Sequence, residues 1–145
     1  MFSKIVVPLD GSSLAEEIVD RVEELARIQG GEIQLLRVAF FYSFPAADTK
    51  KFESEVIESA EKYLEKVSAN LEQKGLTVTM HIRYGDPARE ILAHAEKYGS
   101  VIVMSTHGRG GVSRWAMGSV ADKVIRRSVK TVMLIRVDET KPGGN

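Results

Sequence analysis

Residues 5–9 read Ile-Val-Val-Pro-Leu, an apolar run near the start of the 145-residue chain. Two further runs of this kind follow at 101–104 and 132–135. Short runs without polar residues are typical of strands that helices cover on both faces. Between the runs, apolar residues recur at helical spacing, and one such stripe is formed by Ile57, Ala60, Leu64, Val67 and Leu71. We therefore expect strands and helices to alternate along the chain.

This alternation predicts a single α/β domain over residues 1–140, with a short flexible tail at 141–145. The architecture expected is a three-layer sandwich around a five-stranded parallel sheet of the Rossmann-like kind. The expected strands cover 4–9, 32–39, 76–84, 100–105 and 131–136. One helix is expected to open at Asp86-Pro87, with Asp86 as its N-cap, and the last helix is expected at 119–128.

Strand order decides where a ligand would bind. Apolar and polar residues alternate in 76–84, which favours an edge strand with one face partly exposed to water. The strand order 3-2-1-4-5, counted along the chain, places this strand at an edge, whereas 2-1-3-4-5 would place it centrally. In such sheets ligands bind beyond the carboxyl ends of the strands where the order reverses. That point lies between the first and fourth strands.

The composition excludes several functional classes. Because 20 Lys and Arg balance 20 Asp and Glu, no net positive charge would hold the chain on nucleic acid or an anionic membrane. The chain has no cysteine, so it has no disulfide framework, thiolate nucleophile or zinc-thiolate cluster. Neither a signal-peptide core nor a run long enough to span a membrane is present in the sequence. We expect a soluble cytoplasmic protein without nucleic-acid or membrane partners.

A long segment rich in glycine follows the fourth strand. Gly108, Gly110 and Gly111 allow consecutive N–H groups to turn toward an anion, and Gly118-Ser119 begins a helix whose N-terminus favours negative charge. Residues 107–130 contain six Lys and Arg and one acidic residue, a net charge of +5. We expect the amides gathered by Gly108 and Gly118 to converge on a phosphate. The alternative is that the glycines only turn the loop, Ser119 with Asp122 caps the helix, and the arginines are solvated.

From 5–12 to 132–135 the chain resembles the universal stress protein family. Its nucleotide-binding members share the pattern Gly-x2-Gly-x9-Gly-Ser/Thr, which falls here on Ser105-x2-Gly108-x9-Gly118-Ser119, with serine at the first position. The resemblance implies a fold of the adenine nucleotide alpha hydrolase type and a stress-response regulator that binds ATP or AMP, with Mg²⁺ as the accompanying ion. Because members without the full pattern do not bind nucleotide, a nucleotide-free dimeric interaction module is the alternative.

The resemblance also implies roles for individual positions. Pro8, Leu9 and Asp10 would border the adenosine, with Asp10 on the ribose or on a metal ion. Val38 would offer backbone groups to the adenine edge, and Met104 would pack beside the base. The phosphate side would be formed by Ser105, His107, Gly108, Arg109, Gly110, Gly118, Ser119 and Val120. The residues alone leave alternatives open: a turn at Asp10, core packing for Val38 and Met104, and a loop-orienting hydrogen bond for His107.

No catalytic residue is predicted. The chain lacks the pattern Gly-x4-Gly-Lys-Ser/Thr and a Gly-x-Ser-x-Gly elbow, and no base is evident to activate water, so ATP hydrolysis would be slow at most. The last strand, Val132, Met133, Leu134 and Ile135, has no charge, proline or glycine to protect an exposed edge. We expect a homodimer through this strand, a contact that the family also uses. The alternative is that the C-terminal tail covers the edge.

Overall fold

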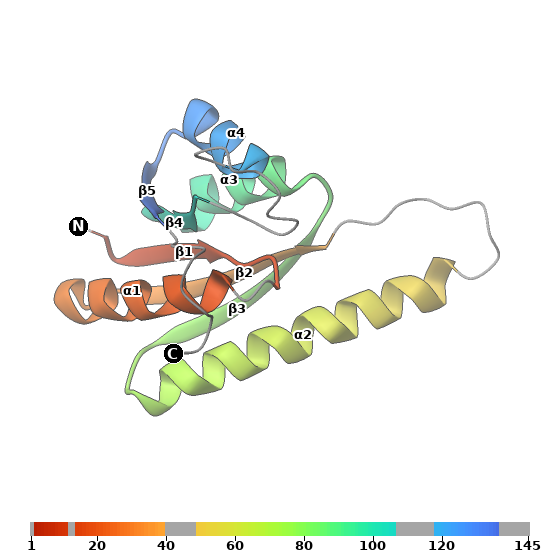
Figure 1. Ribbon diagram of the computed structural model, residues 1–145, viewed down its shortest axis with the longest axis horizontal. Coiled ribbons are helices and arrows are strands. Elements are labelled where there is room, and N and C mark those ends of the chain that lie inside the picture. The colour runs from red at the N-terminus through yellow and green to blue at the C-terminus, as the bar shows by residue number, and fades with distance from the viewer. Residues whose placement is uncertain (1, 12–13, 40–48, 107–117, 137–145) are drawn as a thin grey trace.

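Strands and helices alternate along the described part of the chain in the computed structural model (Figure 1). The structure describes residues 2–11, 14–39, 49–106 and 118–136. The strands are β1 (Lys4–Pro8), β2 (Glu32–Ala39), β3 (Val78–Tyr84), β4 (Val101–Ser105) and β5 (Thr131–Ile135). The helices are α1 (Leu14–Gln29), α2 (Thr49–Gln73), α3 (Pro87–Tyr98) and α4 (Ser119–Arg127). The predicted strand ranges are correct to within two residues.

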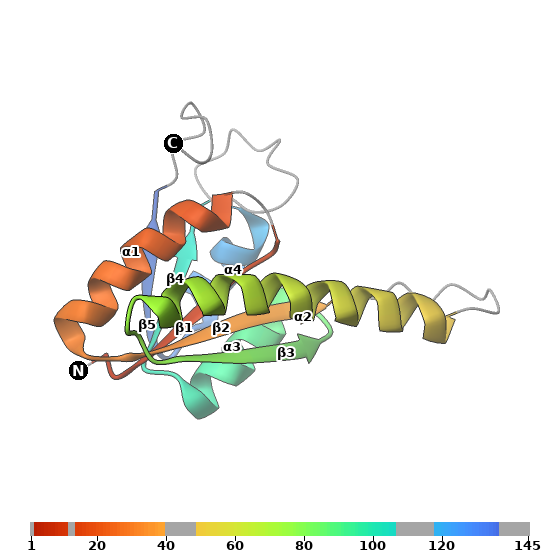
Figure 2. The same ribbon diagram turned by 90° about the horizontal axis from the view of Figure 1, so that it is seen from below.

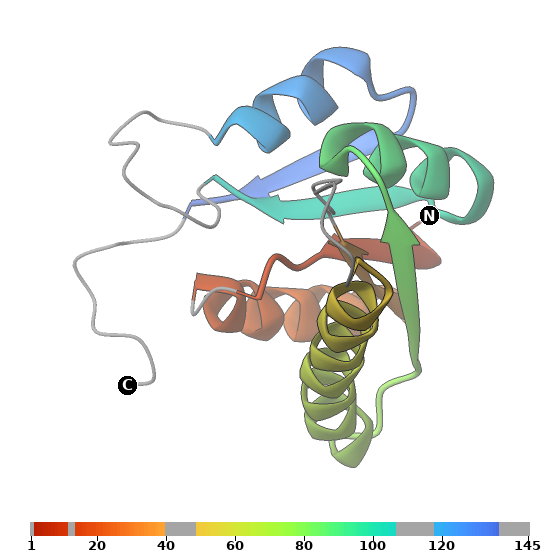
Figure 3. The ribbon, with the colours of Figure 1, turned by 90° about the vertical axis from the view of Figure 1, so that its right-hand side faces the viewer.

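All five strands are parallel, and their order is β3-β2-β1-β4-β5, as the alternation in β3 predicted. Figure 3 looks along the layers, with α1 and α2 on one face of the sheet and α3 and α4 on the other. The order reverses between β1 and β4, so β2 and β3 lie on one side of β1 and β4 and β5 on the other. The fold is therefore the expected three-layer α/β sandwich.

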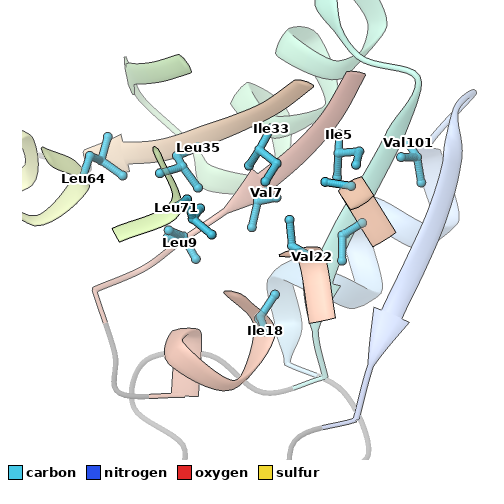
Figure 4. Close-up of a cluster of buried hydrophobic side chains, with 12 residues drawn as sticks. Ile5, Val7, Leu9, Ile18, Val22, Ile33, Leu35, Leu64, Leu71 and Val101 are labelled. Atoms are coloured by element: carbon cyan, nitrogen blue, oxygen red, sulfur yellow. The ribbon is translucent and has the colours of Figure 1, made fainter. Parts of the chain in front are cut away.

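Successive residues of the central strands fill two cores. Ile5, Val7 and Leu9 face α1 and α2, where Ile18, Val22, Leu64 and Leu71 surround them (Figure 4). Val6 faces the opposite way, toward the cluster beneath α3 and α4. Residues 5–7 of β1 are thus completely buried between the two helical layers, as the unbroken apolar run predicted.

Helix α2 is longer than the strands that it covers. Its C-terminal half packs beside β3, whereas its first turns continue past the tip of that strand (Figure 2). Phe52 in these first turns is 49% exposed. At the other end, Gly75 has φ +83° and its N–H bonds the Glu72 carbonyl at 2.9 Å, so the helix ends where glycine permits a left-handed turn.

The polar face of β3 is half-buried, and a hydrogen-bonded layer lies between it and α3. His94 of α3 is 1% exposed, and its Nε2 lies 3.0 Å from Gln34 Oε1. The Gln34 amide nitrogen donates to Glu32 Oε1 and to the Tyr98 carbonyl, both at 3.2 Å. Because the Gln34 oxygen is the acceptor, His94 carries its proton on Nε2.

Two histidines of this layer are adjacent. The rings of His81 and His94 are 4.6 Å apart between centroids, and His81 Nε2 lies 3.0 Å from Thr79 Oγ1. The pKa of His94 is lowered to about 4, mainly by burial and to a smaller extent by the neighbouring His81 and Arg83. Burial also lowers the pKa of His81, with Glu32 acting in the opposite direction. Both imidazoles are therefore neutral at pH 7.

Candidate functional site

The strands separate around β1 at the carboxyl edge of the sheet. The two outer pairs remain matched up to Ala39 with Tyr84 and Ser105 with Ile135. In contrast, β1 remains paired with β2 only up to Pro8 opposite Leu36, and with β4 only up to Val6 opposite Ile102. The edge is therefore open on both sides of β1, and this is the point where the strand order reverses.

Proline accounts for the opening between β1 and β4. The Leu9 N–H donates to the Leu36 carbonyl at 2.8 Å, so the backbone of residue 9 faces β2 and that of residue 8 faces β4. Continuing the ladder beyond Val6 would require residue 8 to donate an N–H to Val103. Because Pro8 has no N–H, the ladder cannot continue.

The opening between β1 and β2 leaves backbone groups of Val38 unpaired. The carbonyl of Ala39 accepts from the Gly85 N–H at 3.1 Å, so Ala39 faces β3 and Val38 faces β1. One further step of the ladder would need the Val38 N–H to donate to Leu9, but the ladder ends before it. Within the residues that the structure describes, neither the N–H nor the C=O of Val38 has a hydrogen-bond partner. A donor and an acceptor are thus available at the crevice.

Arg37 also lies at this opening, and sequence reasoning missed it. Its Nη1 donates to the Leu9 carbonyl oxygen at 3.5 Å. Gly11 follows with φ +83°, and a Cβ at that position would lie 3.7 Å from Arg37 Nη2. The segment 9–11 therefore turns tightly over the guanidinium, and Asp10 lies in the middle of this turn. Asp10 lies directly before the bend at Gly11, beyond the end of β1, and both roles considered for it stay predictions.

Helix α4 begins beside the end of β4. The Gly118 N–H donates to the Thr106 carbonyl at 2.6 Å, so the expectation that this amide faces a phosphate is wrong. The first helical bond runs from Asp122 to Gly118 at 3.0 Å, and the N-cap Gly118 provides no side-chain bond. The N–H groups of the first helical turn, residues 119–121, therefore have no acceptor within the helix. They and the helix dipole favour an anion at this edge.

The start of α4 was interpreted either as an anion site or as a helix end capped by Ser119 with Asp122, and the hydrogen bonds of these two residues test the second interpretation. Ser119 is the first helical residue and not the cap, and Asp122 accepts instead from Arg126 Nε at 3.1 Å. The capping role considered for Ser119 and Asp122 is therefore wrong. The side chain of Ser119 is exposed, whereas Val120 packs against the core beneath the helix.

The remaining candidate residues differ in how far their side chains are buried. Met104 is 7% exposed and Leu9 is 3% exposed, so both side chains belong to the core. The side chain of Val38 also packs on the core, while its backbone faces the opening. Pro8 and Ser105 are half-buried at the ends of β1 and β4. Four predicted residues lie outside the described part of the chain: His107, Gly108, Arg109 and Gly110.

Two further properties bear on the class of protein. In the described ranges, no group of three or more His, Cys, Asp or Glu side chains could hold a metal ion. None of the helices in those ranges has the length and apolar character needed to cross a membrane. The fold defines a doubly wound α/β protein whose strand order reverses between β1 and β4, the kind of position where such sheets bind ligands.

Comparison with known proteins gives the family. Residues 1–136 match the Universal stress protein family, and the chain belongs to it. Universal stress protein MJ0531 of Methanocaldococcus jannaschii is 32% identical over 141 residues, covering 94% of this chain and 83% of that protein. This similarity extends over nearly the whole domain.

Solved structures support the same assignment. The structure of MJ0577, also of Methanocaldococcus jannaschii, superimposes with a TM-score of 0.84 at 26% identity, covering 97% of this chain and 99% of that one. A universal stress protein from Archaeoglobus fulgidus, solved in complex with dAMP, has a TM-score of 0.70 at 24% identity, covering 92% and 98%. At that identity the likeness to the dAMP complex shows the fold.

Proposed function

We propose that this universal stress protein binds an adenine nucleotide, ATP or AMP, in the crevice between β1 and β4. The observation that carries the proposal is the unpaired backbone of Val38 at the opening between β1 and β2, with Asp10 beyond the end of β1 and the first turn of α4 beside the end of β4 at the same edge of the sheet. An exposed donor and acceptor suit the edge of a base, a carboxylate suits a ribose hydroxyl, and unpaired helix amides suit phosphate. The dAMP complex of a relative supports this ligand class.

The residues divide the proposed ligand among three parts of the edge. The base would meet Val38 and the core surface beside Met104. Asp10 would bind the ribose or orient the Mg²⁺ of a metal-nucleotide complex. The phosphates would lie at the start of α4, near Gly118, with the predicted loop residues outside the described part of the chain completing that side.

Binding without rapid catalysis is the expected activity. The described part of the crevice provides amide donors for phosphate, whereas the sequence lacks the pattern Gly-x4-Gly-Lys-Ser/Thr and a Gly-x-Ser-x-Gly elbow. We therefore expect a regulatory protein of the cytoplasm whose nucleotide occupancy changes the surface that it presents. Any hydrolysis of ATP would be slow.

Calorimetric titration of the full chain with MgATP and with AMP tests the proposal. Saturable binding of either nucleotide supports it, and no heat of binding up to millimolar concentrations contradicts it. Mass spectrometry of freshly purified, denatured protein adds an independent measurement. A copurifying adenine nucleotide would count against the nucleotide-free interaction module, which the occupied Gly118 amide otherwise favours.

A substitution at the start of α4 locates the phosphates. Gly118 has φ −65° and ψ 155°, which any residue adopts, so Gly118→Leu is expected to fold. Its side chain would obstruct the first turn of the helix and remove nucleotide binding. Arg127→Leu places the same side chain at the far end of the same helix and serves as the matched control. Unchanged affinity in Gly118→Leu would place the phosphates elsewhere.

We also propose that the protein is a homodimer through β5. This strand is an edge of the sheet and pairs only with β4 among the described strands. A groove runs beside it against α1, lined by Leu25, Ile28 and Met133 with neighbouring residues of β5. Ile28 is 72% exposed, although it lies next to this groove. A second copy of β5 would pair with the free edge and cover this apolar surface.

Light scattering after size-exclusion chromatography tests the dimer. The wild-type chain should have twice the mass of one chain, and Ile28→Lys should shift it toward the monomer. Met80→Lys introduces the same charge at the opposite edge of the sheet, where Met80 is 45% exposed, and should leave the dimer intact. A monomeric wild-type protein would overturn the proposal.

A further inference from the structure

We infer that Arg37 is a positioning residue that keeps the backbone of Val38 available to the base of the ligand. The inference rests on the proposed nucleotide site and adds a cause for its selectivity. It starts from the way the register of β1 and β2 ends at Pro8 and Leu36, although β2 continues to Ala39.

The Val38 N–H and the Arg37 guanidinium would use the same acceptor, the Leu9 carbonyl. In a parallel ladder the Val38 N–H is its next donor, since the Leu9 N–H already bonds the Leu36 carbonyl at 2.8 Å. The structure shows a different donor on this oxygen, Arg37 Nη1 at 3.5 Å. The Arg37 side chain thus bonds the carbonyl oxygen that the next amide along β2, that of Val38, would otherwise use.

The surroundings hold the guanidinium in this place. Gly11 lies over Nη2 in a left-handed conformation that a side chain would strain, so the turn 9–11 closes over Arg37. The aliphatic part of Arg37 leaves β2 on the same face as Leu35, which belongs to the core beneath α1 and α2. Val38 points its own side chain to the opposite core. Arg37 and the side chain of Val38 therefore lie on opposite faces of the sheet. Arg37 can bond the Leu9 carbonyl without entering the face that the Val38 side chain occupies.

The unpaired groups of Val38 match one class of base. Its N–H can donate to a ring nitrogen, and its C=O can accept from an exocyclic amino group, which is the arrangement on the Watson-Crick edge of adenine. Guanine presents a ring N–H and an exocyclic carbonyl there, so donor would face donor and acceptor would face acceptor. Selectivity for adenine over guanine thus depends on Val38 remaining outside the ladder.

Arg37→Met tests this role, because it removes the donor and keeps an unbranched side chain. In the full chain without ligand, amide hydrogen exchange at Val38 should slow by about 2- to 10-fold as its N–H pairs with Leu9, the range expected for one modest hydrogen bond. AMP affinity should fall by a similar factor, about 2- to 10-fold, and the preference for AMP over GMP should fall with it. Arg37→Lys keeps a donor and should retain most of the preference.

Arg83→Met is the matched control. Arg83 lies opposite Val38 on the neighbouring strand and bonds Glu90 at 2.8 Å, so its loss removes the same charge from the same edge without affecting Leu9. It should leave Val38 exchange and the AMP-to-GMP ratio unchanged. The inference is overturned if Arg37→Met also leaves both unchanged. If wild-type protein binds no nucleotide, the proposed function fails, and the exchange measurement alone decides the role of Arg37.

Discussion

Acidification should destabilise the layer between β3 and α3 through His94. The ordinary pKa of histidine is 6.5, and in the folded protein that of His94 is about 4. Above pH 7 the imidazole is neutral in both states and contributes no pH dependence. As the pH falls through 6.5, the unfolded chain takes up a proton that the folded chain refuses, so the free energy of unfolding decreases until about pH 4 and then levels off.

The size of this loss follows from the two pKa values. A pKa difference between about 4 and 6.5 corresponds to a full loss of about 3 kcal/mol, most of which is reached between pH 7.5 and 4.5. His94→Gln removes the titrating ring and keeps an N–H donor for Gln34. The variant should therefore lose about 2 to 3 kcal/mol less stability than wild type over this interval.

Urea unfolding followed by circular dichroism at several pH values measures the difference. Carboxylates such as Glu23, whose pKa is lowered by its bonds with Lys74 and Arg27, also destabilise the fold in acid. They are present in both proteins, so subtracting the two pH curves cancels them. Parallel curves for wild type and His94→Gln would refute the argument, because the buried imidazole would then take up its proton without cost.

Three further predictions concern the crevice and the core. Pro8→Ala supplies an N–H toward Val103, so it should extend the β1–β4 ladder and weaken nucleotide binding. Calorimetry measures the affinity, and an unchanged affinity would mean that binding does not depend on where this ladder ends. Gly11→Ala places a side chain at φ +83° and should lower stability by about 1 kcal/mol in urea unfolding, whereas a neutral result would mean that the turn relaxes freely. Leu64→Ala, at 1% exposure, should lower the free energy of unfolding by about 2–5 kcal/mol, and a loss below that range would show that the core closes around the cavity.

Much of the fold could be predicted because its signals are local. Unbroken apolar runs mark the strands covered on both faces, and Asp86 accepts from the Arg89 N–H at 3.0 Å where an N-cap was expected. The alternation in β3 predicted the strand order correctly. It did not reveal the hydrogen-bonded layer on the polar face, because Gln34 and His94 come from distant parts of the chain and only the folded sheet brings them together.

The site was less accessible from the sequence. Pro8 is a visible signal, since proline cannot donate within a central strand, but its effect depends on which neighbour residue 8 faces. Arg37 gives no signal at all, because an arginine in a strand can face solvent equally well. The role of the Gly118 amide was misjudged because Thr106, its acceptor, becomes a neighbour only when α4 folds back on β4.

The early end of the β1–β4 ladder has a mechanical consequence. In register, Ile5 pairs with Val101 and Val6 with Ile102, and Lys4 is hydrogen-bonded to Ser100 just before β4, so the described pairing beside the central strand is confined to the amino ends of β1 and β4. Units with few cross-links tend to open separately in native-state exchange. A molecule bound to both β1 and α4 would connect the part of the sheet formed by β1, β2 and β3 with the part formed by β4 and β5. The two parts would then unfold together. Such a ligand would slow amide hydrogen exchange in both parts of the sheet, including residues far from the crevice.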